Sequence, residues 1–168
     1  MFIPPMIGHM SNLRSLKLHN NLLIGNIPED LFEATKIEEL MLHSNSLTGS
    51  IPSLVGHLHN LTTLSLSHNS LKGRIPTEMT NLSKIEYIHL QQNFLTGTTP
   101  RVTLVDETEN TAFISDCSTS LLVCESCTMC CNNEGKCQVQ FKFNMKMEDF
   151  VYTIVLSLPI GIALLSNK

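Results

Sequence analysis

Tryptophan is absent from this chain of 168 residues, and aromatic side chains make up only 5% of it. Such scarcity is expected when aliphatic side chains fill a narrow core. Charged residues are also sparse, at 15%, with a net charge of −4 at pH 7. Because a nucleic-acid-binding surface needs a basic patch or stripe, this balance predicts no nucleic-acid partner.

Enzyme signatures are missing as well. The sequence contains no phosphate-binding loop, no nucleophile elbow, no His-Glu-x-x-His zinc motif and no set of kinase signatures. The acidic residues around Asp106 have no partnering base at a motif spacing. We therefore predict that the chain is not an enzyme, with no catalytic residues, no cofactor and no bound metal.

One 24-residue pattern occurs four times without insertion or deletion in the first hundred residues. Written out, the pattern is LxxLxLxxNxLxGxIP, in which x is any residue. Its asparagine column consists of Asn21, Asn45, Asn69 and Asn93. A fixed period of this length is the signature of a solenoid, in which each repeat forms one coil.

The columns of the pattern have physical reasons. In L-x-L both leucines point to one face, as a strand requires, and a single coil buries them only by stacking on its neighbours. A buried asparagine amide satisfies backbone groups at the turn, so the asparagine column predicts a ladder. Apolar residues three apart in the return segment, such as Leu31 and Ala34, favour helical or 3₁₀ turns on the convex side.

The segment Leu47-Thr-Gly49-Ser-Ile51-Pro52 closely resembles plant-type leucine-rich repeats. The repeat pattern predicts an α/β solenoid, a leucine-rich-repeat superhelix with a parallel concave sheet and short helical or 3₁₀ convex turns. The cysteines that follow the repeats add the expectation of a cysteine-rich C-terminal cap. The plant-type family includes receptor-kinase ectodomains, receptor-like proteins and polygalacturonase inhibitors. It implies a secreted or cell-surface array with its ligand on the concave side.

We expect three regions along the chain. Residues 1–103 form the solenoid, with four full repeats and one partial repeat. Residues 104–138 form an acidic linker and cysteine-rich cap, and residues 139–168 hold a strand-like segment and a hydrophobic tail. Since Ile3-Pro4 lies one period before Ile27-Pro28 and no signal peptide is visible, we expect the carboxy-terminal part of a longer protein. The alternative is a short protein with a frayed first coil.

Six cysteines cluster near the end of the chain and are the disulfide candidates: Cys117, Cys124, Cys127, Cys130, Cys131 and Cys137. Their even number and density favour a disulfide-bonded cap, which belongs to an oxidising compartment. Two alternatives stay open. Cys124-x-x-Cys127-x-x-Cys130 with Cys137 has zinc-ligand spacing, or the thiols are free.

The run Cys124-Glu-Ser-Cys127-Thr-Met-Cys130-Cys131 is similar to a cysteine-rich tail of some algal receptor-like proteins. Ser126 stands where that family has a further cysteine, so the resemblance implies a cap next to a membrane but no pairing scheme. Residues 150–165 carry no charge. As a helix they would span about 24 Å, against about 30 Å of hydrocarbon. They are a candidate membrane anchor, with a buried strand or helix and a lipid-anchor signal as alternatives.

The outward strand positions of the solenoid supply the candidate ligand-binding residues. These are Lys17, His19, Glu39, Met41, His43, Thr63, Ser65, Tyr87, His89 and Gln91. Tyr87 is the best single anchor because aromatics dominate interfaces. The histidines are interpreted as polar surface, with a metal or pH-sensitive contact as the alternative. Asn60 and Asn81 begin glycosylation motifs.

Together these features predict a non-enzymatic recognition module that binds a protein or peptide. A glycan ligand and a co-receptor are further candidate partners. The expected location is extracellular or at the cell surface, with residues 150–165 as the membrane contact. The alternatives are a secreted inhibitor of a hydrolase and an intracellular scaffold with a zinc-stabilised cap.

Overall fold

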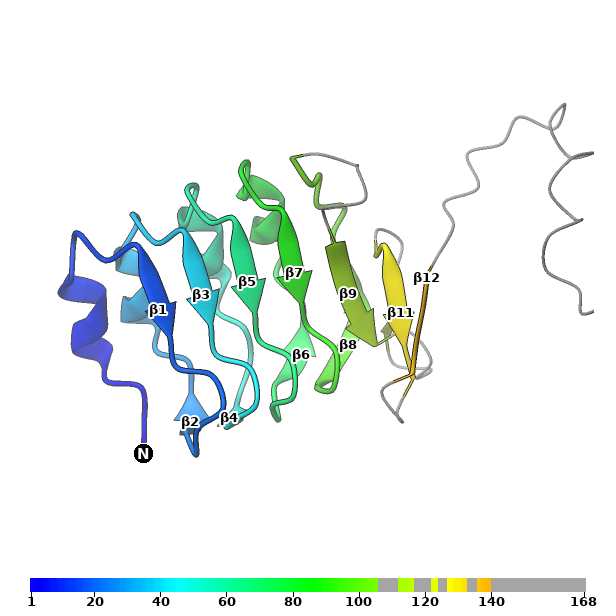
Figure 1. Ribbon diagram of the computed structural model, residues 1–168, viewed down its shortest axis with the longest axis horizontal. Coiled ribbons are helices and arrows are strands. Elements are labelled where there is room, and N and C mark those ends of the chain that lie inside the picture. Colours follow the sequence, from blue (N-terminus) through cyan, green and yellow to red (C-terminus); the bar gives the residue numbers. More distant parts are fainter. Residues whose placement is uncertain (106–111, 117–121, 124–126, 133–135, 140–168) are drawn as a thin grey trace, which may run out of the picture.

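The computed structural model describes residues 1–105, 112–116, 122–123, 127–132 and 136–139 (Figure 1). The main sheet runs along the length of the molecule in the order β1-β3-β5-β7-β9-β11-β12. Its strands are β1 (Ser15–Lys17), β3 (Glu39–Met41), β5 (Thr63–Ser65), β7 (Tyr87–His89), β9 (Ala112–Asp116), β11 (Met129–Cys131) and β12 (Cys137–Val139). All pairs in this sheet are parallel except β11 with β12.

The return segments carry 3₁₀ helices and short lateral strands. The helices are η1 (Pro5–His9), η2 (Glu29–Glu33), η3 (Ser53–His57) and η4 (Thr77–Asn81). The lateral strands are β2 (Ile24–Asn26), β4 (Ser46–Thr48), β6 (Lys72–Arg74), β8 (Phe94–Thr98) and β10 (Leu122–Val123). They pair β2 with β4, and β6 and β10 with β8. Each 3₁₀ helix follows a proline, whose fixed φ ends the extended stretch before the turn.

The core is a continuous aliphatic column between the sheet and the 3₁₀ helices. The central residues of three successive strands, Leu40, Leu64 and Ile88, are 0% exposed. So are Leu31 and Val55 from the convex side. The strands pair in a register of 24 residues, such as Leu40 with Leu64. The structure therefore confirms the predicted solenoid with a parallel concave sheet and 3₁₀ convex turns.

Asparagine side chains tie successive coils together. The Nδ2 group of Asn69 donates to the carbonyls of Leu42 and Leu66, each at 3.0 Å. Its Oδ1 accepts the backbone N–H of Leu47, also at 3.0 Å. Asn45 and Asn93 make the equivalent bonds one coil before and one coil after. Asn45, Asn69 and Asn93 thus each bond their own coil and the preceding one.

The residue before each ladder asparagine has a left-handed backbone conformation, which the repeat pattern does not reveal. These residues are Asn20, Ser44, His68 and Gln92, with φ of 55°, 56°, 54° and 60°. Positive φ is uncommon for residues other than glycine. The bonds that the ladder makes on both sides of this turn hold the backbone in that conformation.

The main sheet continues past the last repeat. β9 pairs in parallel with β7, and Phe113, which is 0% exposed, lies opposite Ile88. β11 adds to β9 in the same direction. Part of the region expected as linker and cap thus extends the solenoid sheet, and the limits of the three regions remain predictions.

The cysteine-rich segment is described in part. Cys127, Cys130 and Cys131 are disulfide-bonded. Cys117, Cys124 and the candidate anchor at 150–165 lie outside the described residues, as does the expected strand at 139–147 apart from Val139. No helix within the described ranges is long and apolar enough to cross a membrane.

Candidate functional site

The concave face of the main sheet presents the first and third residues of each short strand. The middle residue points into the core, so its neighbours point outward. One outward column consists of Ser15, Glu39, Thr63, Tyr87 and Ala112. The next consists of Lys17, Met41, Ser65, His89 and Ile114. These columns hold most of the residues predicted to bind a ligand.

Inward and outward columns differ sharply in chemistry. The inward column between them is Leu16, Leu40, Leu64, Ile88 and Phe113, all apolar. The outward columns combine cationic, anionic, hydroxyl, imidazole, phenol and aliphatic side chains. Because the coil repeats its inward residues and varies its outward ones, the fold does not dictate the chemistry of the concave face.

Charged side chains of the first two coils lie at one end of this face. Arg14 forms an ion pair with Glu38, and the Lys17 ammonium lies 2.8 Å from the Glu39 carboxylate. Hydrogen bonds from Lys17 and from the Ser15 hydroxyl lower the pKa of Glu39. The charges are exposed and paired within the chain, so they add little to stability.

A histidine pair occupies the adjoining part of the face. The rings of His19 and His43 stack with centroids 4.5 Å apart and an interplanar angle of 11°. Nδ1 of His43 lies 3.0 Å from the Ser65 hydroxyl. Burial lowers the pKa of His43, and the nearby His19, His89 and His68 lower it further. The lowered pKa favours an uncharged imidazole at neutral pH, which both donates and accepts hydrogen bonds.

Tyr87 and His89 lie on the fourth coil. Their rings are tilted by 57° with centroids 6.5 Å apart. Both side chains are half-buried, and burial lowers the pKa of His89. On the same coil, Oε1 of Gln91 is buried and has no hydrogen-bond partner among the described residues. The middle of the face therefore combines an aromatic ring with uncharged polar groups.

Ser65 occupies a predicted outward strand position, but its side chain is covered rather than available to a ligand. It is only 5% exposed. The strand register places its short side chain between Met41 and His89, and its hydroxyl contacts His43. Ser65 therefore supports the histidine, while Met41, Thr63 and Gln91 remain half-buried on the face.

The structure adds residues that sequence reasoning missed. Ala112 and Ile114 from β9 continue the two outward columns beyond Tyr87 and His89, and Met129 pairs with Ile114. All three are half-buried. The spacing from Tyr87 to Ala112 is 25 residues rather than 24, so a search at the repeat period does not find them. The short continuous apolar run Ala112-Phe113-Ile114, bounded by polar residues, was the available signal.

The two glycosylation motifs lie on the approach from the convex side. Asn81 is exposed at the end of η4. Asn60 is half-buried, and its Nδ2 lies 3.3 Å from the carbonyl of Thr35. Lys84 donates to Oδ1 of Asn60 at 2.9 Å. In the described ranges no group of three or more His, Cys, Asp or Glu could hold a metal ion.

Comparison with known proteins identifies the repeat. The family model described as "Leucine rich repeat" matches residues 11–71 and 35–95. No curated protein sequence matches the chain.

Several solved structures share the fold. The leucine-rich-repeat ectodomain of the receptor kinase SOBIR1 from Arabidopsis thaliana is 30% identical, with a TM-score of 0.65, and the match covers 73% of this chain and 65% of that one. The plant peptide hormone receptor RGFR1, in complex with RGF2, is 33% identical with a TM-score of 0.61 over 68% of this chain and 19% of that one. A plant ice-binding protein is 32% identical with a TM-score of 0.60 over 72% and 38%. The chain thus spans less than two thirds of the length of each.

Proposed function

This chain belongs to the leucine-rich-repeat family in its plant-type form, and on that premise we propose that it is a non-enzymatic recognition module. Its ligand is a protein or a peptide, held on the concave face of the main sheet. RGFR1, which is similar over 68% of this chain, is a peptide hormone receptor in complex with RGF2. That complex supports a peptide as the first class of ligand to test.

The variation of the outward columns is the observation that carries this proposal. Leu40 and Leu64 point inward with 0% exposure, whereas Glu39, Thr63 and Tyr87 alternate in charge, size and polarity beside them. A surface whose side chains are not needed by the fold is available for recognition. Exposed aromatic and polar groups on a rigid sheet are the composition that interfaces favour.

Tyr87 and His89 are the proposed centre of the site. An aromatic ring offers a large contact area at a low entropy cost, and the uncharged imidazole donates or accepts a hydrogen bond. The paired charges of Lys17 and Glu39 lie at one end, where they would contribute orientation more than affinity. The half-buried Ile114 offers an apolar contact at the other end.

The proposed location is extracellular or at the cell surface. Disulfide bonds at Cys127, Cys130 and Cys131 support it, because disulfides persist in oxidising compartments. The same bonds disfavour a zinc-stabilised intracellular scaffold, since a zinc ligand is a thiolate. Glycans at Asn60 and Asn81, a membrane anchor at 150–165 and association with a co-receptor complete the proposal.

Selection from a random peptide library tests it directly. The chain is immobilised at pH 7.4, bound peptides are isolated, and their dissociation constants are measured for variants. We expect Tyr87→Ala and His89→Ala each to weaken binding by at least about tenfold, as hot-spot truncations do. Lys72→Ala, an exposed position on the lateral strand β6, is the matched control and should leave affinity unchanged.

Two results would overturn the concave site. One is the absence of any peptide with saturable binding. The other is a set of peptides that are insensitive to Tyr87→Ala and His89→Ala but lose affinity with Lys72→Ala, which would move the site to the lateral surface.

A further inference from the structure

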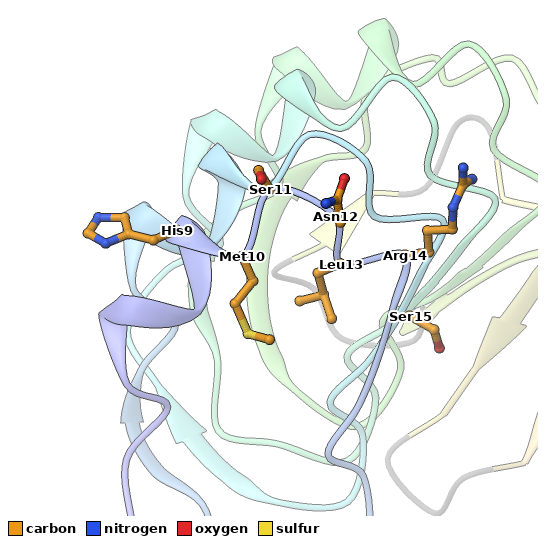
Figure 2. Close-up of a pocket in the computed structure, with 7 residues that line it drawn as sticks. All are labelled: His9, Met10, Ser11, Asn12, Leu13, Arg14 and Ser15. Atoms are coloured by element: carbon orange, nitrogen blue, oxygen red, sulfur yellow. The ribbon is translucent and has the colours of Figure 1, made fainter.

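The two long edges of the concave face differ in charge. Strands β1, β3, β5 and β7 are parallel, so their starts lie along one edge and their ends along the other. The edge of strand starts carries Glu38, Glu39 and Glu86. Arg14, which directly precedes β1, pairs with Glu38, and Figure 2 shows its side chain extending away from that of Leu13. The acidic groups of the face therefore lie along this edge.

Four histidines lie along the other edge, which we call the histidine edge: His19, His43, His68 and His89. His89 ends β7, and the other three follow the ends of β1, β3 and β5 by two or three residues. The rings of His19 and His43 stack with centroids 4.5 Å apart. Burial is the main cause that lowers the pKa of His43, and repulsion from the other three histidines lowers it further. The four imidazoles are thus close enough to disfavour one another's charge.

The histidine edge has no acidic partner of its own in the described part of the chain. None of its four imidazoles forms an ion pair with a carboxylate there. Glu39 is bound by Lys17, which is the remaining cation of this edge. Asp116 faces His68 from the following strand, but both of its oxygens accept backbone N–H groups. Protonation of the histidines therefore adds positive charge that these carboxylates do not balance.

Ser65 connects two of these histidines. Nδ1 of His43 lies 3.0 Å from its hydroxyl, and His89 is its direct partner on the next strand. Ser65 and Ser67 are each 5% exposed, between longer side chains on the neighbouring coils. A protonated His43 donates from Nδ1 to Ser65, so its Nε2 can donate to a ligand. His89, beside the Tyr87 ring, supplies a second donor to the same place.

We propose that the histidine edge binds a carboxylate of the ligand, so that the chain recognises an acidic peptide and holds it more tightly as pH falls. One carboxylate oxygen would accept Nε2–H of His43 and the other an N–H of His89, above the Ser65 hydroxyl. This inference rests on the proposed concave site and names the class of peptide that the site takes. The carboxylate supplies the counter-ion that the described residues do not.

The sign of the pH dependence follows from the form of the histidines that a carboxylate prefers. A hydrogen bond between ionised partners is roughly twice as strong as one between neutral partners. A bound carboxylate therefore favours protonated imidazoles, and binding takes up protons. Each proton taken up raises the affinity by up to about tenfold per pH unit. A glutamate stays ionised at pH 5.5, because its ordinary pKa is about 4.3.

Three defined peptides probe the edge. The first is acetylated and amidated Ala-Glu-Ala-Glu-Ala, and the second is its neutral match, acetylated and amidated Ala-Gln-Ala-Gln-Ala. The third is the neutral sequence with a free carboxyl terminus, which distinguishes a terminal carboxylate from a side-chain one. Each is titrated into the full chain at pH 7.5 and at pH 5.5, with EDTA present to exclude metal bridging, and the histidine ring signals are followed by NMR.

We expect the glutamate peptide to bind saturably and at least about tenfold more tightly at pH 5.5 than at pH 7.5, in line with uptake of one proton or more. The amidated glutamine peptide should show no such gain. A gain for the free-terminus peptide alone would assign the edge to a terminal carboxylate, and would keep the recognition of a carboxylate by the histidines.

Variants assign the pH dependence to particular histidines. The double variant His43→Gln, His89→Gln keeps hydrogen-bonding side chains at both positions but removes their titration. It should bind the glutamate peptide with the same affinity at both pH values. His57→Gln, at an exposed position on η3 on the convex side, is the matched control and should keep the pH dependence of the wild type. Circular dichroism at pH 5.5 verifies that each protein is folded.

Two outcomes would overturn this inference and leave the proposed function standing. One is equal affinity of the glutamate and both glutamine peptides at pH 5.5. The other is an unchanged pH dependence in the double variant. In either case, peptides selected from the library that still depend on Tyr87 would support the concave site. Absence of saturable binding by any library peptide would instead remove the proposed function, and this inference with it.

Discussion

Asp116 closes the asparagine ladder on Asn93. Its Oδ2 accepts the backbone N–H of Asn93 at 3.1 Å, and its Oδ1 accepts that of Gln92 at 2.9 Å. One coil earlier, the equivalent N–H groups of Asn69 and His68 bond the carbonyls of Gln92 and Gln91. A side-chain carboxylate thus replaces the two main-chain carbonyls that a further coil would supply.

Removing this carboxylate should destabilise the carboxy-terminal end of the solenoid. Asp116→Ala leaves two N–H groups without acceptors at a site that is 8% exposed. At roughly 1–3 kcal/mol for each unsatisfied buried group, we expect a loss of about 3 kcal/mol in the free energy of unfolding. Urea denaturation followed by circular dichroism measures it.

Two further variants give this measurement its controls. Asp116→Asn keeps one carbonyl acceptor and should cost less than Asp116→Ala. Glu29→Ala removes an exposed carboxylate from η2 and should stay within about 0.5 kcal/mol of the wild type. Equal stability of Asp116→Ala and wild type would show that the carboxylate does not act as a cap.

The ladder asparagines should differ in their importance according to position. Asn69 is 8% exposed and bonded to both its own and the preceding coil. Asn21 is exposed, and within the described part of the chain its side chain bonds only its own coil. We expect Asn69→Ala to lower the free energy of unfolding by about 3 kcal/mol and Asn21→Ala to lower it by less than about 1 kcal/mol. The reason is that water replaces the lost hydrogen-bond partners only at the exposed site. Similar losses in the two variants, measured by urea denaturation, would contradict this reading.

The coil could be predicted from the sequence because the residues that point into the core recur at the period of the repeat. Leucines at fixed spacing have one arrangement that buries all of them, and the observed register of Leu40 with Leu64 follows from it. Position along the repeat also places Tyr87 and His89 on the concave face. These predictions needed only the alternation of side chains in a strand.

Contacts between coils that involve non-repeating side chains could not be predicted in the same way. The burial of Ser65 depends on the larger side chains of Met41 and His89 in neighbouring strands. The role of Asp116 depends on where the 24-residue period breaks, and a lone carboxylate after the last repeat carries no motif. Such contacts join residues about 24 positions apart whose types do not repeat, so only the folded chain reveals them.

Acidification should weaken the fold through the concave histidines. The pKa values of His43 and His89 are lowered from 6.5, mainly by burial. A lowered pKa means that the folded state disfavours the charged ring, so its contribution to stability is present above about pH 6.5 and is lost as pH falls through the folded pKa. We expect the double variant His43→Gln, His89→Gln to lose less stability than wild type between pH 7.5 and 5.

Thermal unfolding of both proteins across this range is the measurement. Burial raises the pKa of Asp116, which gives the opposite sign: its contribution is present at low pH and is lost as pH rises through the folded pKa. The difference between wild type and the double variant isolates the histidines, because Asp116 is common to both. A parallel decline in the two proteins would exclude the histidines as the cause.

Disulfide bonding should be visible in the intact mass. Cys127, Cys130 and Cys131 are all disulfide-bonded, and three residues cannot pair only among themselves. At least one therefore bonds to Cys117, Cys124 or Cys137, which requires at least two disulfides. Since reduction adds one hydrogen per sulfur, we expect deglycosylated protein to gain about 6 Da if all six cysteines are paired, and about 4 Da at the least. An unchanged mass would mean free thiols, and would remove the main chemical support for an extracellular module.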